Sequence, residues 1–120
     1  IKRVKARVVR ETGYSVAGLQ AAWRNEEAFR YEGVIALLLF PVAVWLSETF
    51  VTFALLGGSL MLIVVVELLN SAIEAVVDQV TSEYAELAGR AKDLGSAAVM
   101  LCIFLMLLVW LAVILDRWWL

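Results

Sequence analysis

Three long stretches without a charged residue constrain the fold of this chain more than any other feature. Residues 33–47, 49–66 and 94–115 contain no Asp, Glu, Lys or Arg. A helix that crosses a membrane needs about 20 predominantly apolar residues. Hydrophobic residues also make up 63% of the 120 positions, against about 45–50% in a typical soluble domain. We therefore predict a single-domain, all-α integral membrane protein with three transmembrane helices at about residues 33–47, 49–77 and 94–115.

The remaining segments are expected to lie at the membrane surfaces. Residues 1–32 form a basic leader and a surface helix, in which Val16, Leu19 and Trp23 recur at helical spacing. Ser15 precedes this apolar pattern and is predicted to be the N-cap of that helix. Residues 78–93 form the connection between the second and third transmembrane helices.

The distribution of basic residues predicts the orientation. With three transmembrane helices, the leader and the connection at residues 78–93 lie on the same side of the membrane. That side carries nine of the ten Lys and Arg residues. Because membrane proteins keep an excess of Lys and Arg in their cytoplasmic loops, we expect the N-terminus on the cytoplasmic face.

The segment "VELLNSAIEAVVD" places polar side chains inside the second apolar helix. Their spacing of i, i+3, i+4, i+7 and i+11 puts them on one face of a helix. We call this set the polar stripe: Glu67, Asn70, Ser71, Glu74 and Asp78.

The position of the stripe along the helix predicts its depth in the membrane. Glu67 lies 18 residues beyond Thr49, or about 27 Å at about 1.5 Å per residue, in a hydrocarbon core of about 30 Å. Glu67 should therefore lie near the inner edge of the bilayer. An ionisable residue at this depth is costly and usually functional. The structural alternatives are interhelical hydrogen bonds for Asn70 and Ser71 and a solvated helix end for Glu74.

Further charged residues should gather on the cytoplasmic side. Glu26 and Glu32 precede the first apolar stretch, and Lys92 and Asp93 precede the third. Carboxylates with a lysine and an amide suit a Mg²⁺–nucleotide site, because hard oxygen ligands hold the metal and cations neutralise phosphate charge. A solvated loop would have a similar composition. The sequence contains neither a Walker motif nor a G-x-G-x-x-G motif.

Three long motifs between Gly13 and Val99 resemble one known family. They read "GYS--GL-AAW-NE-AFR-EG", "ELLNSAIEAVVD" and "SEY-EL--RAKD-GSAAV". This pattern is similar to that of the small integral-membrane diacylglycerol kinases of bacteria. The resemblance implies three transmembrane helices with an N-terminal amphipathic surface helix, assembled as a homotrimer. It also implies transfer of the ATP γ-phosphate to diacylglycerol, which gives phosphatidate at the bacterial inner membrane.

The resemblance also implies roles for individual residues. Glu67 would be the general base that acts on the lipid hydroxyl. Glu26 and Glu74 would hold the Mg²⁺ that accompanies ATP, and Asn70 and Lys92 would contact the phosphates. Further residues expected near ATP are Arg7, Tyr14, Glu83 and Asp93. Those expected near the lipid are Arg7, Trp23, Arg30, Glu32 and Ser96.

Two positions depart from the family pattern, and two other functions compete. Ala85 stands where the family has a histidine, and Tyr31 stands where it has a glutamine. Undecaprenol kinases of the same superfamily share the "E-LN-AIEAVVD" core. A small proton-coupled transporter would use Glu67 as its carrier, but transporter sites usually lie near the middle of the bilayer. We expect no nucleic-acid partner.

Overall fold

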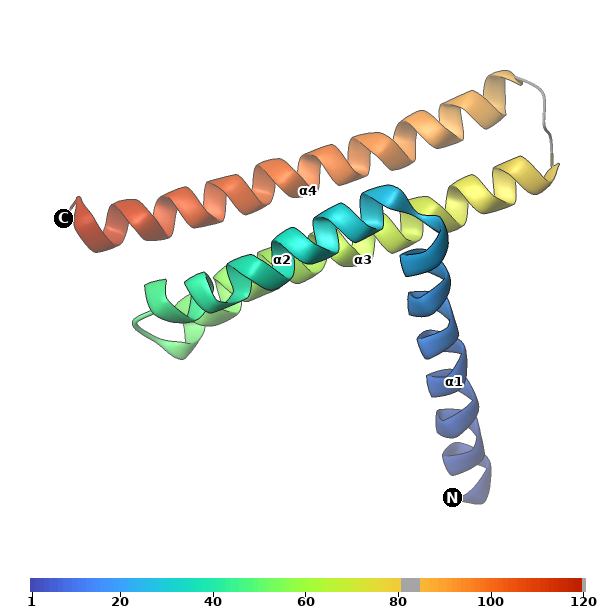
Figure 1. Cartoon of the computed structure of the whole chain (residues 1–120), viewed down its shortest axis with the longest axis horizontal. Coiled ribbons are helices and arrows are strands. Elements are labelled where there is room, and N and C mark those ends of the chain that lie inside the picture. The colour runs from blue at the N-terminus through green and yellow to red at the C-terminus, as the bar shows by residue number, and fades with distance from the viewer. Residues whose placement is uncertain (81–84, 120) are drawn as a thin grey trace.

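Four helices make up the computed structural model over the residues that it describes, 1–80 and 85–119 (Figure 1). Their bounds are Lys2–Asn25 for α1, Glu27–Leu46 for α2, Phe50–Val80 for α3 and Glu86–Trp118 for α4. By length and composition, α2, α3 and α4 are each able to cross a membrane. This confirms the predicted all-helical architecture with three apolar helices.

Helix α3 is the element on which the others pack. Both α2 and α4 lie along it, while α1 leaves the bundle at a steep angle (Figure 1). Because α2, α3 and α4 follow one another in alternating directions, one end of the bundle collects the start of α2, the end of α3 and the start of α4. We call this the polar end, because the polar stripe lies there.

A sharp corner at Glu26 separates α1 from α2. The backbone of Glu26 is extended, with φ −115° and ψ 105°, and its N–H still donates to the Ala22 carbonyl. Arg30 stabilises the corner, since its Nη1 donates to the carbonyl oxygens of Trp23 at 2.8 Å and Arg24 at 3.2 Å. These bonds satisfy carbonyls that the end of α1 leaves without helical partners.

The apolar core lies in the other half of the bundle. Leu46 of α2, Leu56 and Leu60 of α3 and Trp110 of α4 are buried together. Trp110 Nε1 donates to Ser59 Oγ at 3.1 Å, and Ser59 Oγ donates to the Leu56 carbonyl at 2.7 Å. The one polar group of the core tryptophan is thereby paired, as burial of an indole N–H requires.

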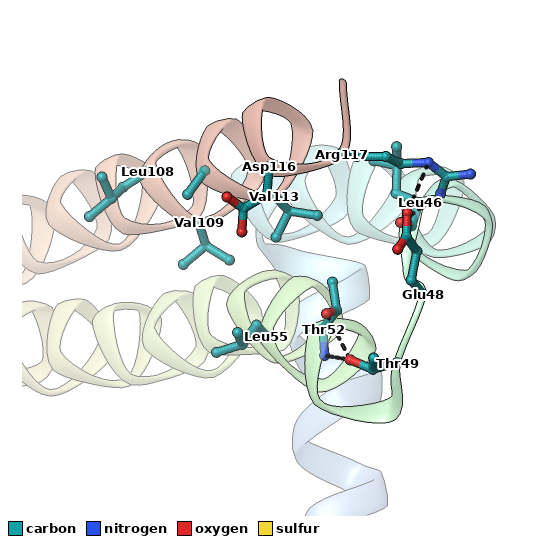
Figure 2. A pocket seen from close by; sticks show the side chains of 11 residues that line it. Leu46, Glu48, Thr49, Thr52, Leu55, Leu108, Val109, Val113, Asp116 and Arg117 are labelled. Atoms are coloured by element: carbon teal, nitrogen blue, oxygen red, sulfur yellow. Dashed lines mark hydrogen bonds and ion pairs between the residues drawn. The ribbon is translucent and has the colours of Figure 1, made fainter. Parts of the chain in front are cut away.

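The end of α4 is tied to the end of α2 through Arg117 (Figure 2). Its Nη1 donates to the carbonyl oxygens of Trp45 at 2.9 Å and Leu46 at 2.8 Å, and its Nε lies 3.7 Å from Glu48 Oε1. The guanidinium also lies over the rings of Trp45 and Trp118. Arg117 therefore caps α2 from another helix.

The helix ends differ from the sequence predictions in several places. Helix α3 ends at Val80 and α4 begins at Glu86, so much of the predicted connection at residues 78–93 is helical. The predicted N-cap at Ser15 is wrong, because α1 begins at Lys2 and runs through this position. Ser15 Oγ instead donates to the Glu11 carbonyl at 3.0 Å, a bond that serine makes inside helices. Helix α2 also begins at Glu27, before the predicted start of the first apolar segment at residue 33.

The bond between Ser59 and Trp110 gives a first prediction, a double-mutant cycle. Interhelical hydrogen bonds of this kind contribute about 0.6 kcal/mol on average and up to about 1.7 kcal/mol in membranes. Ser59→Ala, Trp110→Phe and their combination should show a coupling of this size in unfolding experiments in detergent. Thr12→Ala, which removes only a local bond to the Val8 carbonyl, is the control. Additive losses would mean that the two side chains act independently.

Candidate active site

The polar stripe is buried over its first turns. Glu67 is 5% exposed, and Asn70 and Ser71 are each 8% exposed, although α3 is otherwise apolar. Glu74 is half-buried and Asp78 is exposed. The neighbouring helices of the same chain therefore cover Glu67, Asn70 and Ser71.

Asn70 lies directly against Gly95 of α4. A Cβ atom at Gly95 would collide with Asn70 Oδ1, so only glycine allows the two helices to approach this closely. Asn70 Nδ2 donates to Glu74 Oε1 over a long 3.4 Å. Its Oδ1 is buried and has no hydrogen-bond partner within the described residues. This oxygen is therefore enclosed between α3 and α4 without a hydrogen bond from a described donor.

Lys92 of α4 forms an ion pair with Asp78 of α3. Its Nζ lies 2.7 Å from Asp78 Oδ1, and both side chains are about half exposed, at 45% and 64%. Lys92 also lies near enough to Glu74 to interact with its charge. The structure therefore brings Asn70, Glu74 and Lys92, three of the residues predicted from the sequence, to one region.

Glu67 faces a second carboxyl group. The Glu32 side chain of α2 lies within hydrogen-bonding reach of Glu67. Glu32 Oε2 is buried and accepts no hydrogen bond from a described donor. A pair of carboxyl groups in one protected position is a common arrangement for proton transfer.

A groove of about 590 Å³ runs between α1 and α3 beside the stripe. Its walls come from one face of α1, from the Glu26 corner and from the turn of α3 that carries Ser71. Apolar and small side chains dominate the lining, which includes Gly18, Leu19, Ala22, Leu68, Ala72 and Ala75. Ser71 Oγ is buried without a described hydrogen-bond partner. The groove thus combines a largely apolar lining with the polar side chains of Glu26 and Ser71, as an amphiphilic substrate would require.

The described residues contain no group of three or more His, Cys, Asp or Glu side chains placed to hold a metal. Glu26 and Glu74 nevertheless have the carboxylate oxygens that Mg²⁺ prefers. Protein Mg²⁺ sites often use only one or two carboxylates together with water and substrate phosphates. The donor set of the polar end therefore fits a magnesium ion that arrives with a nucleotide.

Other predicted site residues lie on α1 and α4. Arg7 pairs with Glu11 at 3.7 Å on α1, and Tyr14 is 66% exposed; both belong to the helix that leaves the bundle (Figure 1). Asp93 and Ser96 are exposed on α4. Trp23 is half-exposed, next to the corner that Arg30 caps. The predicted nucleotide contact at Glu83 falls outside the described residues.

A second cavity of about 590 Å³ lies at the opposite end of the bundle. Leu55 of α3 and Leu108 and Val109 of α4 line its apolar part, and Thr49, Glu48 and Arg117 line its rim (Figure 2). Three of the rim groups are paired: Thr49 Oγ1 accepts from the Thr52 N–H at 3.1 Å, and Glu48 pairs with Arg117. This arrangement serves helix capping, so we place the candidate active site at the polar end.

The sequence did not indicate that Gly95, or Asp78 as the ion-pair partner of Lys92, belongs to the candidate site. Gly95 stands in an apolar stretch with other small residues, and nothing in its context indicates that it faces Asn70. Asp78 lies one helical turn beyond Glu74 on the same face of α3. This spacing could have indicated that Asp78 lies near the site.

Comparison with known proteins shows clear similarity over most of the chain. The sequence profile of a family described as prokaryotic diacylglycerol kinase matches residues 13–114. A diacylglycerol kinase of Escherichia coli K12 is 55% identical over 104 residues, which cover 87% of this chain and 85% of the relative. Those of Haemophilus influenzae and Pseudomonas aeruginosa are 44% and 42% identical, over 86% and 92% of this chain and 87% and 89% of their own lengths.

The contact between Gly95 and Asn70 gives a second prediction. Gly95→Ala should force the Asn70 side chain to turn away and should destabilise the protein by about 1–3 kcal/mol, the usual cost of overpacking. Gly58→Ala is the matched control, because a Cβ atom there meets nothing within 4 Å. Thermal unfolding in detergent measures both. In a protein that already carries Asn70→Ala, Gly95→Ala should cause little further loss of stability. If the loss is unchanged, the added Cβ atom collides with a group other than Asn70.

Proposed function

The chain belongs to the prokaryotic diacylglycerol kinase family, and on this premise we propose that it phosphorylates sn-1,2-diacylglycerol with ATP. The products are phosphatidate and ADP. The observation that carries the proposal is Glu67, a carboxyl group only 5% exposed on an apolar helix. A base in such a position meets the hydroxyl of a membrane lipid with little competition from water. This is the requirement of general-base catalysis on a lipid acceptor.

Glu67 acts on the acceptor hydroxyl. The O–H bond of diacylglycerol breaks and its proton passes to the Glu67 carboxylate. The hydroxyl oxygen forms a bond to the γ-phosphorus, the bond between this phosphorus and the β,γ-bridging oxygen breaks, and ADP leaves with that oxygen. Glu67 then returns the proton to water at the cytoplasmic surface.

The phosphate side of the reaction is assigned to the cytoplasmic end of the stripe. Glu26 and Glu74 would hold the Mg²⁺ of the nucleotide, and this ion would neutralise phosphate charge. Asn70 offers its Nδ2 amide group as a donor to the phosphates, and the long 3.4 Å bond from this nitrogen to Glu74 Oε1 supports that assignment. Lys92 approaches the phosphates by leaving Asp78, which its 45% exposed side chain allows.

The remaining contacts are divided between nucleotide and lipid. We assign Arg7, Tyr14, Glu83 and Asp93 to the nucleotide, and Trp23, Arg30 and Ser96 to the lipid side of the groove. Arg7 and Tyr14 lie on the helix that projects from the single chain (Figure 1). Their separation from the stripe supports a homotrimer in which other copies complete the nucleotide site.

We place the enzyme in the bacterial inner membrane with its active site on the cytoplasmic face. The polar end joins the start of α2 to the end of α3, on the side that holds nine of the ten basic residues. The excess of Lys and Arg supports the cytoplasmic assignment. Diacylglycerol in the membrane and ATP in the cytosol would meet at this surface.

The proposal predicts different defects for two carboxylates of the stripe. Glu67→Gln should lower turnover by about 10²–10⁴-fold, the usual contribution of general-base catalysis, with nucleotide affinity retained. Glu74→Gln should instead weaken Mg–ATP binding and raise the Mg²⁺ concentration required. Turnover and nucleotide binding are measured for both variants in the same mixed micelles.

Asp116→Asn serves as the control for these variants, because Asp116 lines the cavity at the far end of the bundle. Its turnover should equal that of the unmodified protein. Normal turnover of Glu67→Gln would refute the base assignment and leave the stripe with an interhelical structural role.

A further inference from the structure

Glu32 lies on the face of α2 that packs against α3. Phe29, three residues earlier, is buried, and Ala36, four residues later, packs against the core. At helical spacing these positions share one face. Glu32 is therefore directed into the bundle, and its carboxyl group lies within hydrogen-bonding reach of Glu67.

A hydrogen bond between two carboxyl groups requires a proton between them, because ionised carboxylates only accept. Glu32 Oε2 is buried and accepts no bond from any described nitrogen or hydroxyl. Leaving such an oxygen unpaired costs about 1–3 kcal/mol or more. A proton held between Glu32 and Glu67 lets one carboxyl group donate to the other and fixes the two side chains relative to each other.

The nearby basic side chains are engaged elsewhere. Arg30, two residues before Glu32, donates to the Trp23 and Arg24 carbonyls at the corner of α1. Lys92 pairs with Asp78 at 2.7 Å. In the described part of the chain, the group that faces Glu32 is thus another carboxyl and not a cation.

We propose that Glu32 is a positioning residue for Glu67, which it holds by a hydrogen bond between α2 and α3. This inference rests on the proposed lipid kinase activity. It gives Glu32 a role distinct from the lipid contact that the family resemblance implies. One oxygen of Glu67 bonds Glu32, and the other is left to take the proton of the acceptor hydroxyl.

The test separates a role through Glu67 from a lipid contact. Glu32→Leu removes the hydrogen bond and should lower kcat by up to about 10²-fold, as loss of alignment does, with an unchanged KM for diacylglycerol. Glu32→Gln should retain most turnover, because its amide N–H can donate to Glu67. Glu27→Gln, an exposed carboxylate of the same helix, should have no effect.

A double variant decides the mechanism. If Glu32 acts through Glu67, Glu32→Leu combined with Glu67→Gln is no slower than Glu67→Gln alone. Multiplied losses, or a raised KM with normal kcat, would overturn the inference. Glu32→Met replaces the leucine variant if that variant does not fold.

The same variants separate this inference from the proposed activity. An unmodified protein that phosphorylates no lipid would refute the proposed function. Unfolding of the single and double variants in detergent then still decides whether the two carboxyls are paired. A coupling free energy between positions 32 and 67 supports the pair, and strict additivity contradicts it.

Discussion

The burial of polar side chains on an apolar helix is the constraint on which this structure depends. Inside a packed bundle, a buried polar atom without a hydrogen-bond partner destabilises the fold. Glu67 meets Glu32 of α2, and Asn70 meets Gly95 of α4. The two contacts determine how closely α2 and α4 can approach α3. The corner at Glu26 then turns α1 across the same end and forms the groove.

The two ends of the bundle differ in whether their buried polar groups have hydrogen-bond partners. Around Trp110 and Arg117 the hydrogen-bonding groups are paired with one another or with helix carbonyls. The buried side-chain oxygens without a described partner are Glu32 Oε2, Asn70 Oδ1 and Ser71 Oγ, and all three lie at the polar end. Native proteins rarely leave such atoms unpaired. Their concentration at the polar end, where Ser71 also lines the groove, is the structural argument for a substrate at this end.

Sequence reasoning predicted the features that depend on local pattern. Length and apolarity indicated three long helices, and the spacing from Glu67 to Asp78 indicated one polar face. The predicted N-cap at Ser15 failed because a serine inside a helix can bond the carbonyl four residues earlier, and the sequence does not show which option is used. The contacts of Gly95 with Asn70 and of Glu32 with Glu67 join different helices, so no spacing within one segment could reveal them.

The central claim is that the buried stripe serves phosphoryl transfer to a membrane lipid. The most direct measurement incubates the purified protein in mixed micelles with Mg²⁺ and ATP labelled at the γ-phosphate, with diacylglycerol and undecaprenol supplied in parallel. The account predicts label in phosphatidate, dependent on both Mg²⁺ and diacylglycerol. Label confined to undecaprenyl phosphate, or proton flux through the protein with no labelled lipid, would contradict it.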